Sequence, residues 1–98
     1  MIIYHIVLPE AWLAFEGDAY SAASLETEGF IHCSYATQLD AVLQRYYSGA
    51  SRVVILEIDA DRLTSELREE PSTNNEIYPH IYGAINRDAI VEISERKI

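Results

Sequence analysis

Residues 28–34 read Glu28-Gly29-Phe30-Ile31-His32-Cys33-Ser34 and combine a turn glycine, a short apolar run, an imidazole, a thiol and a hydroxyl. In an extended segment, successive side chains point to opposite faces, so His32 and Ser34 share one face while Ile31 and Cys33 share the other. If Ile31 and Cys33 pack against a core, His32 and Ser34 face a cleft. The stretch therefore predicts a strand with a site beside it, and it does not specify a reaction.

Four other segments have the β-branched and aromatic composition of strands. They span residues 2–8, 53–59, 77–82 and 89–94. The segment 53–59 reads VVILEID, has the most strand-like composition in the chain and is expected to be central. Pro79 cannot donate to a strand ladder, which argues that the segment 77–82 is an edge strand or contains a bulge.

Two helices are indicated between these strands. Pro9 suits a first helical position and Gly17 suits the closing one, which predicts a short helix over 9–16. A longer amphipathic helix is predicted over 36–47, with Ser34 as a candidate cap, because apolar residues recur there at helical spacing. These residues are Leu39, Val42, Leu43 and Tyr46.

The remaining segments carry turn signals. We expect irregular chain over 18–28, with a brief extended piece near Tyr20. A short helical segment, capped by Asp59 or Asp61, is expected to run through Leu63 and Leu67. A mobile polar loop is expected over 68–76. The count is four or five strands with two or three short helices. It predicts one small α+β domain over 1–98, with a split sheet of antiparallel or mixed strands.

Charge limits the classes of partner. The chain carries 16 acidic and 7 basic residues, for a formal net charge of -9 at pH 7, which repels nucleic acid and anionic membrane surfaces. A single cysteine excludes a disulfide framework within the chain, and neither an export signal nor an apolar run of about 20 residues is evident. We therefore expect a cytoplasmic protein that binds a small molecule rather than nucleic acid or membrane.

All three histidines, His5, His32 and His80, lie inside predicted strands with apolar neighbours. With a water molecule, three convergent imidazoles would form an open zinc site suited to hydrolysis, but their spacing matches no metal motif and no metal is expected. A nucleophilic Cys33 with a histidine base is a second alternative, although Cys33 faces away from His32. In a third, each histidine packs in the core and bonds to a backbone carbonyl.

Tyrosines and one carboxylate complete the set of candidates. Tyr20, Tyr78 and Tyr82 offer flat rings with polar tips, which suit a planar ligand ring such as nicotinamide or adenine, and core packing explains them equally well. Glu70 precedes a proline-led loop and can supply a carboxylate to a cleft. A carboxylate beside an imidazole can divide acid and base roles with it.

Several motifs together resemble DUF952, a small bacterial family of unknown function. The resemblance runs from residue 3 to about residue 92 and is most specific where GFIHCS is followed by a Tyr-Pro-His-x-Tyr-Gly element. The matching positions are IYHI at 3–6, Trp12, Tyr20, SLETEGFIHCS at 24–34, Gln38, VVILEID at 53–59, Glu70 and YPHIYG at 78–83.

The resemblance implies a fold similar to that of ADP-ribosyltransferases, in which a split sheet forms an NAD-binding cleft. It implies that His5 matches the histidine that contacts the adenosine ribose, and that His32 resembles a histidine of the RNA 2'-phosphotransferases on this fold. Glu70 is the candidate for the glutamate that polarises the ribose. The sequence departs from these patterns in two ways: Glu69 stands where family members often have tryptophan, and no arginine cluster accompanies His5 or His32.

The leading hypothesis is a cleft that binds NAD or a related nucleotide and that supports ADP-ribosyl transfer or NAD glycohydrolysis. The catalytic candidates are His5, His32 and Glu70, and the ligand-binding candidates are Tyr20, Ser24, Ser34, His80 and Tyr82. A non-catalytic module that binds a small ligand is the main alternative, and a metal-dependent hydrolase is a further one.

Overall fold

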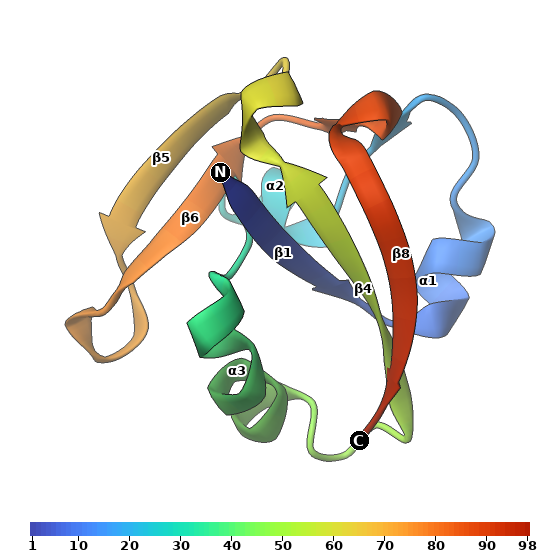
Figure 1. Ribbon diagram of the computed structural model, residues 1–98, viewed down its shortest axis with the longest axis vertical. Coiled ribbons are helices and arrows are strands. Elements are labelled where there is room, and N and C mark those ends of the chain that lie inside the picture. The colour runs from blue at the N-terminus through green and yellow to red at the C-terminus, as the bar shows by residue number, and fades with distance from the viewer.

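The computed structural model describes residues 1–98 and contains two three-stranded antiparallel sheets (Figure 1). In the first sheet, β4 (Arg52–Asp59) lies between β1 (Ile2–Val7) and β8 (Ile90–Lys97). The expected central position of 53–59 is confirmed. Its side chains are buried on both faces because helices and the second sheet cover them.

The second sheet has the order β3 (Ile31–His32), β6 (Ile77–Tyr82) and β5 (Glu66–Pro71). A two-stranded ribbon pairs β2 (Ala19–Tyr20) with β7 (Ile85–Asn86). Every pairing is antiparallel, so the sheets are split as expected and none is mixed. The α+β architecture is confirmed, with eight strands in place of four or five; the additional strands are β5 and the two-residue strands β2 and β7.

The main core lies between the two sheets. The alternation predicted for residues 31–34 is confirmed there. Ile31 is fully buried and Cys33 is 4% exposed, and both pack with Ile3, Leu56 and Ile81. His32 points the other way and is exposed. Ile31 therefore serves the core and His32 the site, while Cys33 packs in the core and also borders the cavity.

Three short α-helices flank the sheets. α1 (Pro9–Ala14) and α2 (Ala23–Thr27) pack beside the main core, and α3 (Leu39–Tyr46) covers the opposite face of the first sheet (Figure 1). None of the helices combines the length and apolar composition that crossing a membrane requires. Single turns of 3₁₀ helix occur at Ala36–Gln38, Ala60–Arg62, Thr73–Asn75 and Arg87–Ala89.

Two expectations for the helical segments are wrong. Ser34 does not cap the helix that follows it; the cap is Tyr35, whose backbone N–H donates to Gln38 Oε1 at 3.0 Å. Residues 18–28 are not simply irregular, because α2 forms within them. The extended piece near Tyr20 is confirmed as β2.

The expectation of a mobile loop over 68–76 is also wrong for the first part of that segment. Its residues up to Pro71 belong to the edge strand β5, and the expected helical segment ends at Arg62 instead of reaching Leu67. Charged side chains suit an edge strand, where they face solvent and oppose pairing with other chains. Arg68 and Glu66 illustrate this with an exposed ion pair at 2.7 Å.

Pro79 lies in the central strand β6 and not at an edge or a bulge, which corrects a third expectation. Its carbonyl accepts from the backbone N–H of Cys33 at 3.1 Å, so its nitrogen also faces β3. Since β3 ends at His32, the missing donor costs one bond beside the end of a short strand. The ladder between β5 and β6 stays continuous from Glu66 to Pro71.

Candidate functional site

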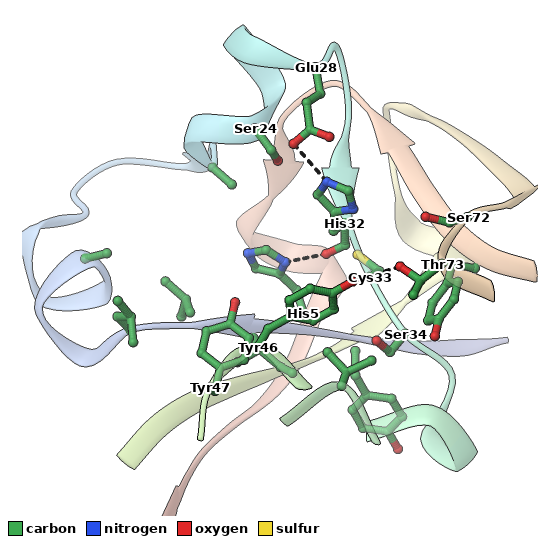
Figure 2. A pocket seen from close by; sticks show the side chains of 18 of the residues that line it. His5, Ser24, Glu28, His32, Cys33, Ser34, Tyr46, Tyr47, Ser72 and Thr73 are labelled. Carbon is green, nitrogen blue, oxygen red and sulfur yellow. Dashed lines mark hydrogen bonds and ion pairs between the residues drawn. The ribbon is translucent and has the colours of Figure 1, made fainter. Parts of the chain in front are cut away.

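The two sheets are joined by one isolated bridge between β1 and the end of β3. Tyr4 and Ser34 exchange two backbone hydrogen bonds of 2.9 and 2.8 Å. At the next residue of β1, the contact to the other strand is made by a side chain and not by the backbone. His5 Nδ1 lies 2.7 Å from the carbonyl oxygen of His32. The strands therefore separate beyond the bridge, and a cavity of about 740 Å³ opens beside them (Figure 2).

Five of the eight predicted site residues line this cavity. They are His5, Tyr20, Ser24, His32 and Ser34. They come from β1, β2, α2 and the 31–34 stretch, which lie far apart in the sequence. The other three, Glu70, His80 and Tyr82, lie on β5 and β6 and do not line the cavity.

His5 is an uncharged hydrogen-bond acceptor in the cavity wall. Burial lowers the pKa of His5 to about 4, against a smaller opposing effect of the His32 carbonyl. Because a carbonyl only accepts, Nδ1 carries the proton and Nε2 keeps its lone pair. Nε2 lies 3.4 Å from the hydroxyl of Tyr20, and burial raises the pKa of that phenol to about 12, so the phenol remains a donor.

Glu28 and His32 are in hydrogen-bonding contact at the cavity (Figure 2). His32 Nε2 lies 3.0 Å from Glu28 Oε2, and both side chains are about half exposed. The sequence interpretation assigned no role to Glu28, although its four-residue spacing from His32 was visible in the 28–34 stretch. Glu28 is the one carboxylate that lines the cavity, and no lysine or arginine does.

Tyrosine dominates the aromatic lining. Five of the seven tyrosines of the chain border the cavity: Tyr4, Tyr20, Tyr46, Tyr47 and Tyr78. Tyr46 was expected on the apolar face of its helix, but its side chain extends across the cavity to Thr73, with the two hydroxyl oxygens 2.8 Å apart (Figure 2). The helical pattern concealed this role because a tyrosine at an apolar position is usually a packing residue.

Glu70, His80 and Tyr82 form a separate network on the face of the second sheet. Glu70 Oε1 accepts from the Tyr82 hydroxyl at 2.5 Å and from His80 Nδ1 at 2.8 Å. The bond from Tyr82, then that from His80, lowers the pKa of Glu70. Phe30 stacks on the His80 ring at a centroid distance of 4.1 Å, and His80 Nε2 is buried without a partner.

This network touches the cavity only through a ring contact, with the centroids of His32 and His80 5.6 Å apart. Glu70 already accepts two hydrogen bonds, and Arg68 lies 4.2 Å over the Tyr82 ring. The geometry therefore assigns these residues to holding β5 and β6 together beside the site.

Removing the phenol of Tyr82 tests this network. In Tyr82→Phe, Glu70 loses the hydrogen bond that contributes most to stabilising its ionised form, so the pKa of Glu70 is expected to rise. Carboxyl carbon shifts followed by NMR against pH measure it directly. Glu66 on the same strand bonds to Arg68 instead, and its titration should not move. An unchanged Glu70 titration would show that the phenol does not support the carboxylate.

Two alternative sites lose their geometric basis. Burial raises the pKa of the Cys33 thiol, which therefore stays protonated and a poor nucleophile. The three histidines do not converge, because His80 bonds to Glu70 while His5 bonds to the His32 carbonyl. No group of three or more His, Cys, Asp or Glu side chains is arranged to hold a metal ion, so the three-histidine hydrolase lacks its ligand set.

Residues 6–93 match the model of a protein family described as a protein of unknown function, DUF952. The chain belongs to this family. The DUF952 assignment confirms the family expected from the 24–34 and 78–83 motifs. No curated protein matches the sequence.

The DUF952 fold is shared with protein CC0527 from Caulobacter crescentus. Its crystal structure matches with a TM-score of 0.86 and 24% identity, over 97% of this chain and 85% of CC0527. The solution NMR structure of CC0527 matches with a TM-score of 0.82 and 24% identity, over 99% and 85% of the two chains. At this identity the likeness establishes the fold alone.

Proposed function

We propose that the cavity between β1 and β3 binds a small ligand with a planar heteroaromatic ring, and that NAD or a related nucleotide supplies that ring. The observation that carries the proposal is the convergence of His5, His32 and five tyrosines on one cavity of about 740 Å³. Small-molecule sites usually measure about 300–1,000 Å³ and combine aromatic walls with a few fixed polar groups.

The polar groups of the cavity suit a ring that carries an amide or amino group. His5 Nε2 is a neutral acceptor whose contact with the Tyr20 hydroxyl is long, at 3.4 Å, and an amide or amino group is a donor that can replace that contact. The hydroxyl of Ser24 donates to the Phe30 carbonyl at 2.8 Å, so its oxygen is free to accept from a ligand. Nicotinamide and adenine both carry a donor of this kind on a flat ring.

The ADP-ribosyltransferase resemblance gives this proposal its ligand class. It rests on His5 in the first strand and on a split sheet with a cleft, and a cavity at the split between the sheets is consistent with it. The same resemblance leads us to propose NAD rather than an unrelated aromatic compound.

A catalytic form of the proposal is ADP-ribosyl transfer or NAD glycohydrolysis, and the Glu28–His32 pair favours it. The bond between ribose C1' and the nicotinamide nitrogen would break, with its electron pair leaving on nicotinamide. A carboxylate would stabilise the oxocarbenium-like ribose, and water or an acceptor would add at C1' and release a proton to a nearby base. Glu28 lines the cavity and is the better placed carboxylate for this step than Glu70, which is bonded to His80 and Tyr82.

Ligand-observed NMR with NAD, ADP-ribose, nicotinamide and AMP tests the proposal. We expect at least one of the four to bind, and its affinity to fall at least tenfold in His5→Ala and in His32→Ala, each confirmed to be folded by its thermal melt. Tyr82→Phe, which alters a hydroxyl outside the cavity, should bind as the wild type does.

The same samples separate the two forms of the proposal. Release of nicotinamide from NAD over hours, lost in Glu28→Gln, would support catalysis, whereas bound NAD that stays intact would support a non-catalytic binding module. Binding of none of the four compounds would overturn the proposed function.

A further inference from the structure

The cavity lacks the groups that hold phosphate. The side chains that proteins most often use to bind phosphate are those of arginine and lysine, because they present positive charge and N–H donors. No lysine or arginine lines the cavity, and the buried imidazole of His5 is neutral. A phosphate in this cavity would meet the Glu28 carboxylate and no lysine or arginine of the lining.

One basic side chain approaches the lining from outside. Arg45 Nη1 lies 3.5 Å from the Tyr78 hydroxyl, and its guanidinium carbon lies 5.7 Å from the centre of the Tyr46 ring. The side chain is exposed and does not border the cavity. Arg45 therefore adds positive charge at the rim, where solvent and salt screen it.

The same lining suits a positive charge. Tyrosine faces attract cations, and five tyrosines border the cavity. Glu28 is the one carboxylate of the lining, where it contacts His32, and the chain as a whole carries a net charge of -9. A ring with delocalised positive charge would gain from both the aromatic faces and the carboxylate, without requiring a counter-ion.

We infer that the cavity selects a cationic, phosphate-free nitrogen heterocycle, of the class of an N-substituted pyridinium or its nucleoside, over the corresponding nucleotide. The inference rests on the proposed function and narrows its ligand class. A pyridinium nucleoside keeps the ring, the amide and the positive charge of NAD, and it leaves out the phosphates that the cavity does not neutralise.

Isothermal titration at low salt with five compounds tests the inference. They are 1-methylnicotinamide, nicotinamide, nicotinamide riboside, nicotinamide mononucleotide and NAD. We expect the riboside to bind at least tenfold more tightly than the mononucleotide, and 1-methylnicotinamide to bind about fivefold more tightly than neutral nicotinamide. Added salt should weaken the preference for the methylated ring.

Glu28→Gln supplies the matched variant, because it removes the lining charge and keeps the shape of the side chain. It should reduce both preferences to less than twofold. Glu26→Gln should leave them unchanged, because Glu26 is an exposed residue of α2, the helix that Glu28 follows, and does not line the cavity. A mononucleotide or NAD that binds as tightly as the riboside would overturn this inference and leave the proposed function standing. Binding by none of the five would overturn both.

Discussion

The free energy of unfolding is expected to fall by about 3 kcal/mol between pH 7 and pH 4 on account of His5 alone. Burial lowers the pKa of His5 from 6.5 to about 4 in the folded protein. Between these two values the unfolded chain binds a proton that the folded protein excludes. The stabilisation is therefore complete above pH 6.5 and is lost as the pH falls toward 4.

Urea denaturation of the wild type and of His5→Asn at pH 7, 6, 5 and 4 measures this contribution. The asparagine amide retains a donor for the His32 carbonyl, which His5 Nδ1 contacts at 2.7 Å, but it does not titrate. The carboxylates that both proteins share contribute equally to the two curves, so their effect cancels in the difference. The free energy of unfolding of the variant should fall by about 3 kcal/mol less than that of the wild type over this range. Parallel curves for the two proteins would mean that His5 does not exclude its proton on folding.

The sequence contained enough information to predict which residues of the 31–34 stretch face the core. Strand alternation requires only that the segment be extended, and Ile31 and Cys33 did pack inside while His32 and Ser34 reached the cavity, which Cys33 also borders. The bounds of β6 were also predictable, because the apolar run from residue 77 ends at Gly83. Local patterns were sufficient wherever a single element decided the outcome.

β5 could not be recognised in the same way. Four of its six residues are charged, which is typical of a loop, and the strand exists because β6 offers it a continuous ladder. β6 follows after residues 72–76, so β5 is the first arm of a hairpin whose pairing its own composition does not indicate. Tertiary pairing therefore outweighed local composition at this edge.

The candidate site was predicted in part for a related reason. Alternation groups Tyr78, His80 and Tyr82 on one face of β6, but it does not indicate which of them reaches the split between the sheets. Only Tyr78 does so, because Glu70 binds the other two on the same sheet face. Glu28 was missed because its role depends on α2, a helix that the sequence did not reveal.

Replacing Gln38 by leucine is expected to destabilise the fold by about 2–5 kcal/mol. Gln38 is buried, and its amide joins two parts of the chain that carry cavity residues. Oε1 accepts from the Tyr35 backbone N–H at 3.0 Å, while Nε2 donates to the Ile77 carbonyl at 2.8 Å and to Glu76 at 3.2 Å. Leucine has a similar size but leaves these backbone groups without their partner, at about 1–3 kcal/mol each.

Thermal melting of Gln38→Leu and Gln44→Leu separates the loss of the Gln38 hydrogen bonds from the general effect of replacing a glutamine by leucine. Gln44 lies on the exposed side of α3, so its replacement should change stability by less than about 0.5 kcal/mol. For a chain of this length the Gln38 variant should melt at least roughly 10 °C below the control. The start of α3 and the entry to β6 would then depend on one side chain, which also fixes the distance between the tyrosines that each element contributes to the cavity. Equal melting temperatures for the two variants would instead mean that the backbone groups of Tyr35 and Ile77 find other partners.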